Sequence, residues 1–191
     1  MCRSRAWPRS LNPHVDVIAL ARAGSRLQHA DQMLTQVRDR LTAGARRSGG
    51  ERTQGMDDNK AVAVLSDVHK PVAQARDDVL VAYGIATVTL ALKSKAQDRA
   101  LDAYGTLAGL ADGLDDTLAA LQLAGADATL LSCACQTLGQ AVVHLARGIG
   151  DDDLAAGGDG RTPVRLAMQF TVHAEATAGS ANPPTPAAPS R

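Results

Sequence analysis

The sequence contains very few large side chains with which to fill a core. Aromatic residues make up 2% of its 191 residues, and they are Trp7, Tyr83, Tyr104 and Phe170. A chain of this length fits one domain with tails, so the core has to be built from leucine, valine and alanine. Such side chains let helices approach closely, but they define packing geometry less sharply than interlocking large side chains do.

Cysteines and long apolar runs are also scarce. The three cysteines, Cys2, Cys133 and Cys135, are too few for a disulfide framework, which favours a reducing compartment. The longest strongly apolar run, Val79–Leu92, has 14 residues, whereas a membrane-spanning helix needs about 20. We therefore expect a cytoplasmic protein without a membrane span.

The side chains that usually carry chemistry form no recognisable site. Glu51 and Glu175 are the only glutamates, whereas a di-metal site in a helical bundle needs several glutamates and Glu-x-x-His pairs. The five histidines are scattered, and the acidic run at 151–153 lacks the spacing of a calcium loop. The glycines between 148 and 160 have no strand-to-helix context that would make them a phosphate-binding loop. We therefore predict a non-enzymatic protein with no metal ion and no other cofactor.

Charge is balanced overall but unevenly distributed. Residues 1–55 carry ten basic and four acidic side chains, although the whole chain has 20 of each kind. We interpret this pattern as complementarity between a basic first helix and an acidic remainder. A basic arm that binds nucleic acid or a membrane surface is the alternative. The dispersed basic residues and the lack of aromatic residues among them disfavour that alternative.

A heptad pattern follows residues 1–11, which we expect to be a disordered leader. Asn12 and Pro13 are typical of a helix start, because asparagine caps the helix and proline is tolerated in the first turn. Leucines then recur every seven residues, at Leu20, Leu27, Leu34 and Leu41. This seam predicts a helix over 12–43, and the Gly-, Arg- and Ser-containing stretch after it predicts a flexible linker over 44–57.

Met56, inside this linker, would open a plausible shorter protein. The sequence leaves open whether translation starts at Met1 or at Met56.

Helical patterns continue over 58–150, which we predict to be the helical core. A helix should run from Asp58 to His69, and Pro71 should start or kink the next segment because it lacks the backbone N–H. The segment Val79–Leu92 fits a buried helix, but its alternating apolar residues also fit a strand. The helical neighbours favour the helix.

The most regular apolar seam lies on a predicted helical hairpin between Asp98 and Gly150. Apolar residues step by three and four positions along its first helix. They include Tyr104, Leu107, Leu114, Leu118 and Leu121. Gly125 should end that helix in a left-handed conformation, and Asp127 should cap the next one.

The segment Gly125–Ser132 also resembles the turn and the second helix of a helix-turn-helix motif. The helix that follows has no Lys or Arg before Arg147, and the preceding helix is acidic, so neither would attract phosphates. A helix-turn-helix DNA-binding regulator is therefore the alternative function, and nucleic acid is not the expected partner.

The C-terminal part, 151–191, should contain a loop, a strand-like segment and a Pro-rich disordered tail. Five apolar residues alternate with the residues between them, which predicts an amphipathic β-strand. They are Val164, Leu166, Met168, Phe170 and Val172.

Together these patterns predict an all-α fold: a helical bundle or helical hairpins of four to five helices, with a single C-terminal β-strand and disordered ends. Apolar seams have to be buried, so we expect a protein partner or a homo-oligomer. We predict an interaction, scaffold or adaptor protein that acts through ten residues: Leu20, Leu27, Leu34, Leu41, Tyr104, Leu107, Leu114, Leu118, Leu121 and Phe170.

Overall fold

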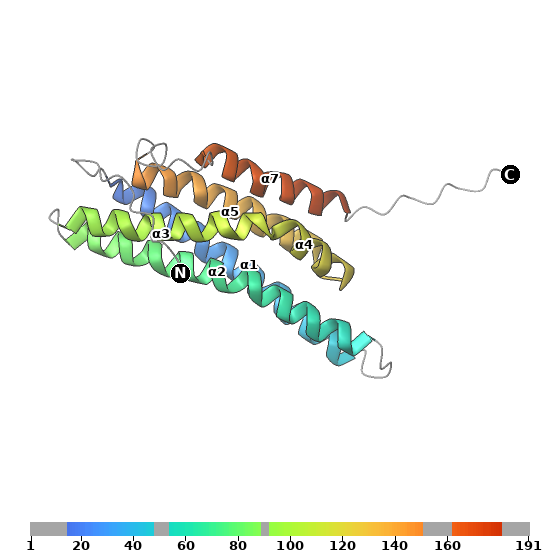
Figure 1. Ribbon diagram of the computed structural model, residues 1–191. Coiled ribbons are helices and arrows are strands. Elements are labelled where there is room, and N and C mark those ends of the chain that lie inside the picture. The colour runs from blue at the N-terminus through green and yellow to red at the C-terminus, as the bar shows by residue number, and fades with distance from the viewer. Residues whose placement is uncertain (1–14, 48–53, 89–91, 151–161, 181–191) are drawn as a thin grey trace, which may run out of the picture.

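A computed structural model describes residues 15–47, 54–88, 92–150 and 162–180. In these ranges the chain forms six α-helices and no β-strand (Figure 1). The helices are α1 (Val17–Arg47), α2 (Gln54–Val88), α3 (Lys93–Asp112), α4 (Leu114–Leu123), α5 (Ala128–Ile149) and α7 (Pro163–Ser180). The predicted all-α helical bundle is confirmed, whereas the predicted disordered leader and Pro-rich tail lie outside the described residues.

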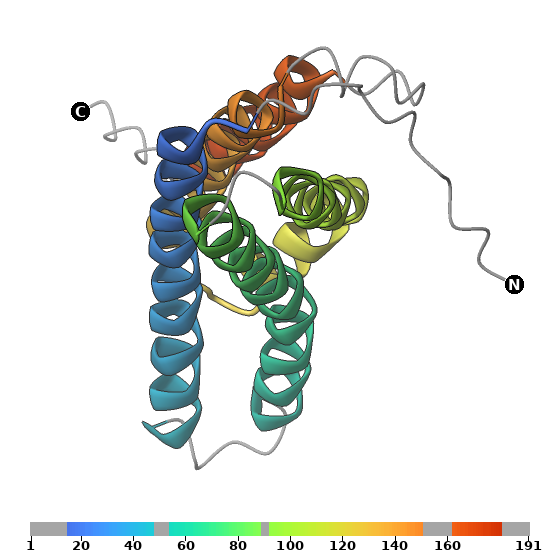
Figure 2. The ribbon, with the colours of Figure 1, turned by 90° about the vertical axis from the view of Figure 1, so that its left-hand side faces the viewer.

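Four helices surround a common core, and α7 lies outside them. α5 packs against α1, α1 against α2, α2 against α3, and α3 against α5, which closes the ring (Figure 2). α7 packs mainly against α5, on the side away from α2. The start of α1 is also tied to the end of α5, because the backbone N–H of Asp16 donates to the carbonyl oxygen of Gly148 at 3.1 Å.

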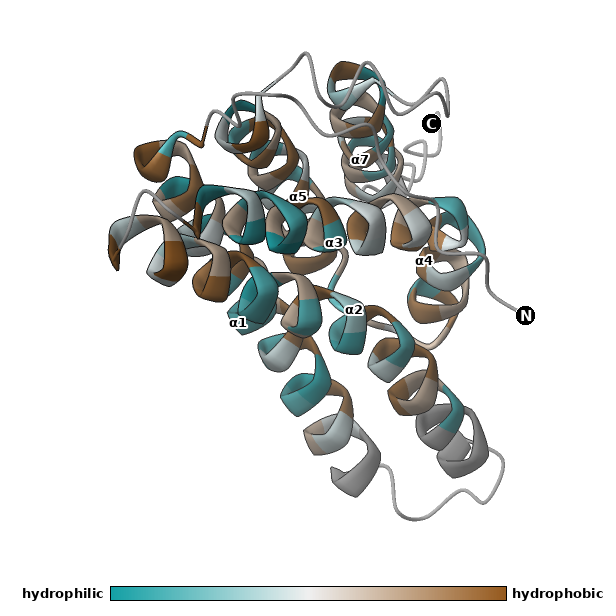
Figure 3. Cartoon of the chain, turned by 60° about the vertical axis from the view of Figure 1, so that its left-hand side comes forward, coloured by the Kyte–Doolittle hydropathy of each residue, from teal (hydrophilic) through white to brown (hydrophobic). Residues whose placement is uncertain are grey.

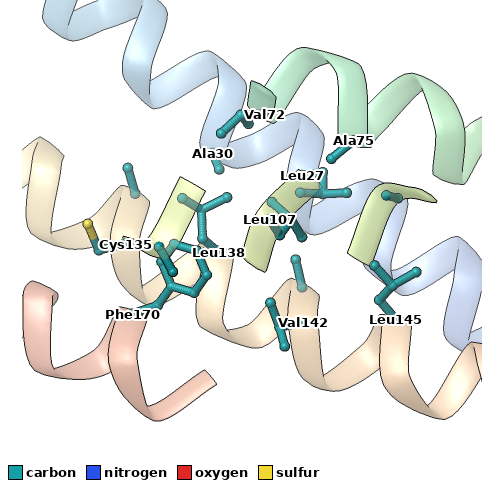
Figure 4. Packing of buried hydrophobic residues seen from close by; sticks show 14 of the residues in the cluster. Leu27, Ala30, Val72, Ala75, Leu107, Cys135, Leu138, Val142, Leu145 and Phe170 are labelled. Atoms are coloured by element: carbon teal, nitrogen blue, oxygen red, sulfur yellow. The ribbon is translucent and has the colours of Figure 1, made fainter. Parts of the chain in front are cut away.

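The core is aliphatic and lies where the helices meet. Figure 4 shows Leu27 of α1 and Leu107 of α3 pointing toward each other, with Val142 of α5 beneath them. Phe170 points from α7 toward Leu138 of α5 and is fully buried. Apolar and polar residues are interleaved along each helix (Figure 3), as expected when one side of a helix is buried. None of the helices described here combines the length and apolarity needed to cross a membrane.

α1 begins later and ends later than predicted. Its first helical residue is Val17, and the Asp16 carboxylate caps it by accepting hydrogen bonds from the backbone N–H groups of Ile18 (2.9 Å) and Ala19 (3.1 Å). The predicted helix start at Asn12 and Pro13 lies outside the described ranges, within which α1 begins at Val17. The predicted linker over 44–57 is also too long, because α1 extends to residue 47 and α2 begins at residue 54.

α2 runs through Pro71 without interruption, so the predicted helix boundary near His69 is wrong. Proline inside a helix costs about 3 kcal/mol. Burial of one continuous seam on both sides of it offsets that cost, since Val68, Val72 and Val79 are all buried. The helical alternative for Val79–Leu92 is correct as far as Val88, where α2 ends.

The junction before α5 has the predicted geometry. Gly125 adopts a left-handed conformation with φ of +75°, and the Asp127 carboxylate accepts a hydrogen bond from the backbone N–H of Leu130 at 3.1 Å. The preceding helical segment is divided at Gly113 into α3 and α4.

The segment predicted as a C-terminal strand is helix α7. In a helix, its alternating apolar residues separate into two opposite sides, because a step of two residues turns the chain by about 200°. Leu166 and Phe170 face α5 and are buried. The start signals of the helix were missed: Pro163 takes its first position, and Thr162 Oγ1 accepts a hydrogen bond from the backbone N–H of Arg165 at 3.3 Å.

Candidate functional site

The ten residues predicted to form an interaction surface all lie in the core of a single chain. None of them has more than 8% of its surface exposed. The heptad residue Leu20, for example, packs against Gly148 of α5, as the close approach of its side chain to that glycine indicates. These seams therefore hold the bundle together, and their use by a partner remains a prediction.

The segment Gly125–Ser132 leads into a helix that is covered by its neighbours. α5 packs against α1, α7 and α3, and its exposed residues are Thr129, Gln136, Gln140 and Arg147. A recognition helix has to enter the major groove of DNA with its side chains free. The geometry therefore gives no support to a helix-turn-helix function.

A half-buried ionic network joins α1 to α2. Asp31 Oδ1 lies 3.0 Å from His69 Nε2, and Arg76 Nη1 donates to Asp31 Oδ2 at 2.5 Å. Hydrogen bonding to Asp77, together with the charge of Asp31, raises the pKa of Arg76. Thr35 Oγ1 lies 3.3 Å from the same His69 nitrogen, so the three groups superficially resemble a hydrolytic triad.

The geometry of this network does not fit nucleophilic catalysis. In a catalytic triad the carboxylate binds one ring nitrogen of histidine and the hydroxyl binds the other. Here Asp31 and Thr35 both approach Nε2 of His69, and the Thr35 hydroxyl donates to the Asp31 carbonyl oxygen at 2.9 Å. The network thus joins two helices. No local sequence pattern could reveal it, because its members are far apart in the chain.

The groups that could hold a metal or act as a nucleophile are dispersed. Among the described residues, no three His, Cys, Asp or Glu side chains gather as a metal site would require. Burial raises the pKa of the Cys135 thiol to about 12, so this thiol is protonated at neutral pH and is a poor nucleophile.

An open groove between α1 and α5 has a concentration of positive charge. It has a volume of about 500 Å³ and is lined by Arg22, Ser25, Arg26 and His144; we call it the α1–α5 groove. Burial lowers the pKa of His144, and the charges of Arg147, Arg22 and Arg26 lower it further. Arg22 and Arg26 thus share the groove with this imidazole, and Arg147 is its neighbour three residues further along α5.

No described carboxylate neutralises these arginines. Residues 17–30 and 128–150 contain no Asp or Glu. The two carboxylates that flank the first of these segments have other partners, since Asp16 caps α1 and Asp31 binds Arg76 of α2. Within the described ranges, Arg22, Arg26 and Arg147 take part in none of the ion pairs. The predicted charge complementarity holds for Arg40, which binds Asp127, but not for this groove.

The outward side of α7 is apolar and exposed. The exposed fractions of Val164, Met168 and Val172 are 67%, 61% and 60%, and these residues follow one another at intervals of four. We call them the outer stripe of α7. Because α7 lies at the edge of the bundle (Figures 1 and 3), this stripe can be reached from solvent.

Other exposed apolar side chains are found on α1, α2 and α4. They are Ile18, Leu80, Val81, Tyr83, Val88 and Leu123. Leu80 already packs over Gly24 of α1, and Leu123, 91% exposed, lies beside a smaller groove of about 250 Å³ between α2 and α4. These residues do not form a stripe of regular spacing on one helix.

No family model, curated protein or solved structure matches the chain. Its function therefore has to be inferred from its own surfaces.

Proposed function

We propose that the chain is a non-enzymatic interaction protein that pairs with a second copy of itself through the outer stripe of α7. The observation that carries this proposal is the exposure of Val164, Met168 and Val172 on a helix whose other side is already buried. The packing of α7 against α5 does not need these three large apolar side chains, because they lie on the opposite side of the helix. Covering them with another apolar surface is favourable, at about 25 cal/mol per Å².

The stripe is suited to antiparallel pairing about a twofold axis. Met168 stands at its centre, with Val164 and Val172 four positions to either side. A twofold contact brings the same surface of both copies together, so Met168 would meet Met168 and Val164 would meet Val172 of the second copy.

The charges of α7 favour the same arrangement. Arg165 lies near the start of the helix and Glu175 near its end. Antiparallel pairing brings each arginine toward the glutamate end of the other copy, whereas parallel pairing would bring like charges together. The helix dipoles are also opposed in the antiparallel pair.

The contact is small, so we expect a dimer that dissociates on dilution. Stable protein interfaces bury about 1,200–2,000 Å² in total, and one row of three side chains supplies less than that. Sedimentation velocity over a wide concentration range should show a reversible monomer–dimer equilibrium.

Charge placed on the stripe should abolish the equilibrium. We expect Met168→Glu to be monomeric at every concentration, because pairing would bury two carboxylates against each other. Leu123→Glu is the matched control, since it introduces the same charge at an exposed leucine on α4. It should dimerise like the parent protein.

A charge exchange tests the orientation. Arg165→Glu alone should weaken the dimer, and adding Glu175→Arg to it should restore pairing. A parent protein that stays monomeric at all concentrations would refute the proposal. So would a dimer that Val81→Glu dissociates and Met168→Glu does not.

A further inference from the structure

Within the described residues, the positive charge of the α1–α5 groove is balanced by no carboxylate. Arg22 and Arg26 are four residues apart on one face of α1, where like charges disfavour a helix. Arg147 adds a third guanidinium from α5, since it lies three residues after His144 and the two are neighbours on the helix surface. All three arginines are exposed, and none is held in place by a described carboxylate. An anion would remove this repulsion.

We infer that the α1–α5 groove binds a small phosphate-bearing anion, with Arg22, Arg26 and Arg147 as charged donors and Ser25 and His144 as further polar contacts. This site lies on a different surface from the outer stripe of α7, so it does not depend on the proposed dimer.

The donor set favours phosphate over a carboxylate. Guanidinium groups match phosphate oxygens with paired N–H donors, and three of them supply more charge than a single carboxylate can balance. The Ser25 hydroxyl adds a neutral donor between Arg22 and Arg26. A phosphate dianion has both the charge and the number of acceptor oxygens to engage these groups together.

The size of the groove favours a small ligand over a long polyanion. Arg22 and Arg26 are about 6 Å apart along the axis of α1, at 1.5 Å per residue. A duplex or a membrane contacts basic residues spread over a wide face, whereas this cluster occupies about one turn of α1 and the last turns of α5. A volume of about 500 Å³ leaves room beside one phosphate for a second phosphoryl group or an organic part.

Pyrophosphate is a suitable probe, because it carries two phosphoryl groups and no other recognition element. Isothermal titration calorimetry of the full chain at low ionic strength should show binding. Arg22→Gln and Arg26→Gln should each weaken it about tenfold or more, the usual effect of losing a charged hydrogen bond. Arg22→Lys keeps the charge without the paired donors and should lie between Arg22→Gln and the parent protein.

Arg38→Gln is the matched control. It removes an exposed arginine of α1 that does not line the groove, and should leave the affinity unchanged. Circular dichroism should show the same helix content for every variant, because the replaced side chains are exposed. Met168→Glu should also bind pyrophosphate normally, which separates the fate of this site from that of the dimer.

The pKa of His144, measured by nuclear magnetic resonance with and without pyrophosphate, gives a second test. It would not change if the groove arginines only stabilised the fold. The charges acting on this imidazole are those of Arg147 on its own helix and Arg22 and Arg26 on α1. A bound anion offsets them, so the pKa of His144 should rise when pyrophosphate is added. No such rise is expected in Arg22→Gln, where binding is weakened.

Three results would overturn the inference. The first is absence of both heat and a His144 response at low ionic strength. The second is an equal loss of affinity in Arg38→Gln and Arg22→Gln. The third is binding to duplex DNA, or to phosphatidylcholine vesicles that contain phosphatidic acid, without any binding of pyrophosphate.

Discussion

α5 and α7 are both rich in apolar residues, but the bundle uses them differently. α5 is packed against α1, α3 and α7, and most of its residues are buried. α7 is packed mainly against α5, so one apolar side is buried and the outer stripe is left exposed. The apolar content of a helix therefore does not tell how much of it holds the fold. Its position in the bundle decides that.

The strongest test of this contrast compares the two sides of α7. Phe170→Ala should lower the free energy of unfolding by about 3–5 kcal/mol, because it leaves a cavity in the core. Met168→Ala on the outer side should change it by less than about 0.5 kcal/mol. Urea unfolding followed by circular dichroism, at a concentration where the protein is monomeric, measures both. Similar losses in the two variants would contradict the division of α7 into an inner and an outer side.

The burial of α5 should also protect the Cys135 thiol from alkylation. Because the pKa of Cys135 is raised to about 12, its thiolate fraction at pH 8 is about a thousandfold below that of a thiol with an ordinary pKa near 9. Iodoacetamide should therefore modify the half-buried Cys133 well before Cys135 in the folded protein, as peptide mass spectrometry can show. In urea the two should react alike, and a fast-reacting Cys135 in the folded chain would mean that α5 is less enclosed.

One glycine in each helix tests the same contrast between α5 and α7, with a smaller expected change in stability. A Cβ atom at Gly148 of α5 would lie 2.7 Å from Leu20 Cδ2, so Gly148→Ala should destabilise the protein by about 1–3 kcal/mol through overpacking. Gly179 of α7 has nothing within 4 Å of such an atom, so Gly179→Ala should be neutral or stabilise slightly, by up to about 1 kcal/mol. Thermal unfolding of both variants checks the pair, and the reverse order would be inconsistent with close packing of α5 on α1.

The smallest expected effect is a dependence of stability on pH from His144. Its pKa is lowered in the folded chain from 6.5, so the unfolded chain binds more protons just below that pH. The contribution of His144 is then complete above pH 6.5 and is lost as the pH falls from 6.5 through the lower pKa of the folded chain. Urea unfolding on either side of pH 6.5 should show a smaller difference in His144→Gln than in the parent protein. An unchanged difference would indicate that other groups dominate.

The helices could be predicted where a sequence pattern fits only one type of secondary structure. The heptads from Leu20 to Leu41 and the cap at Asp127 are such patterns, and both are present as expected. The strand prediction failed because strict alternation also fits a helix with two opposite apolar sides. The boundary at Pro71 failed because the local cost of proline was outweighed by burial along α2, which a local pattern cannot reveal.

The candidate surfaces were less predictable than the helices, for two different reasons. The seams of apolar residues were identified correctly as patterns, but a sequence does not show whether the same chain covers them. The α1–α5 groove joins Arg22 to His144, which are 122 positions apart, so only the fold brings them together. The one available signal was the absence of acidic residues from 17–30 and 128–150.

The pairing of α1 with α5 has a consequence for how the protein is made. α5 leaves the ribosome about 100 residues after α1, which takes about 5–20 s at typical rates of synthesis. During that interval Leu20 and its neighbours can pack against α2 but lack their later partner. The nascent chain therefore passes through a stage with an apolar helix face uncovered, when it is most exposed to aggregation and to capture by chaperones.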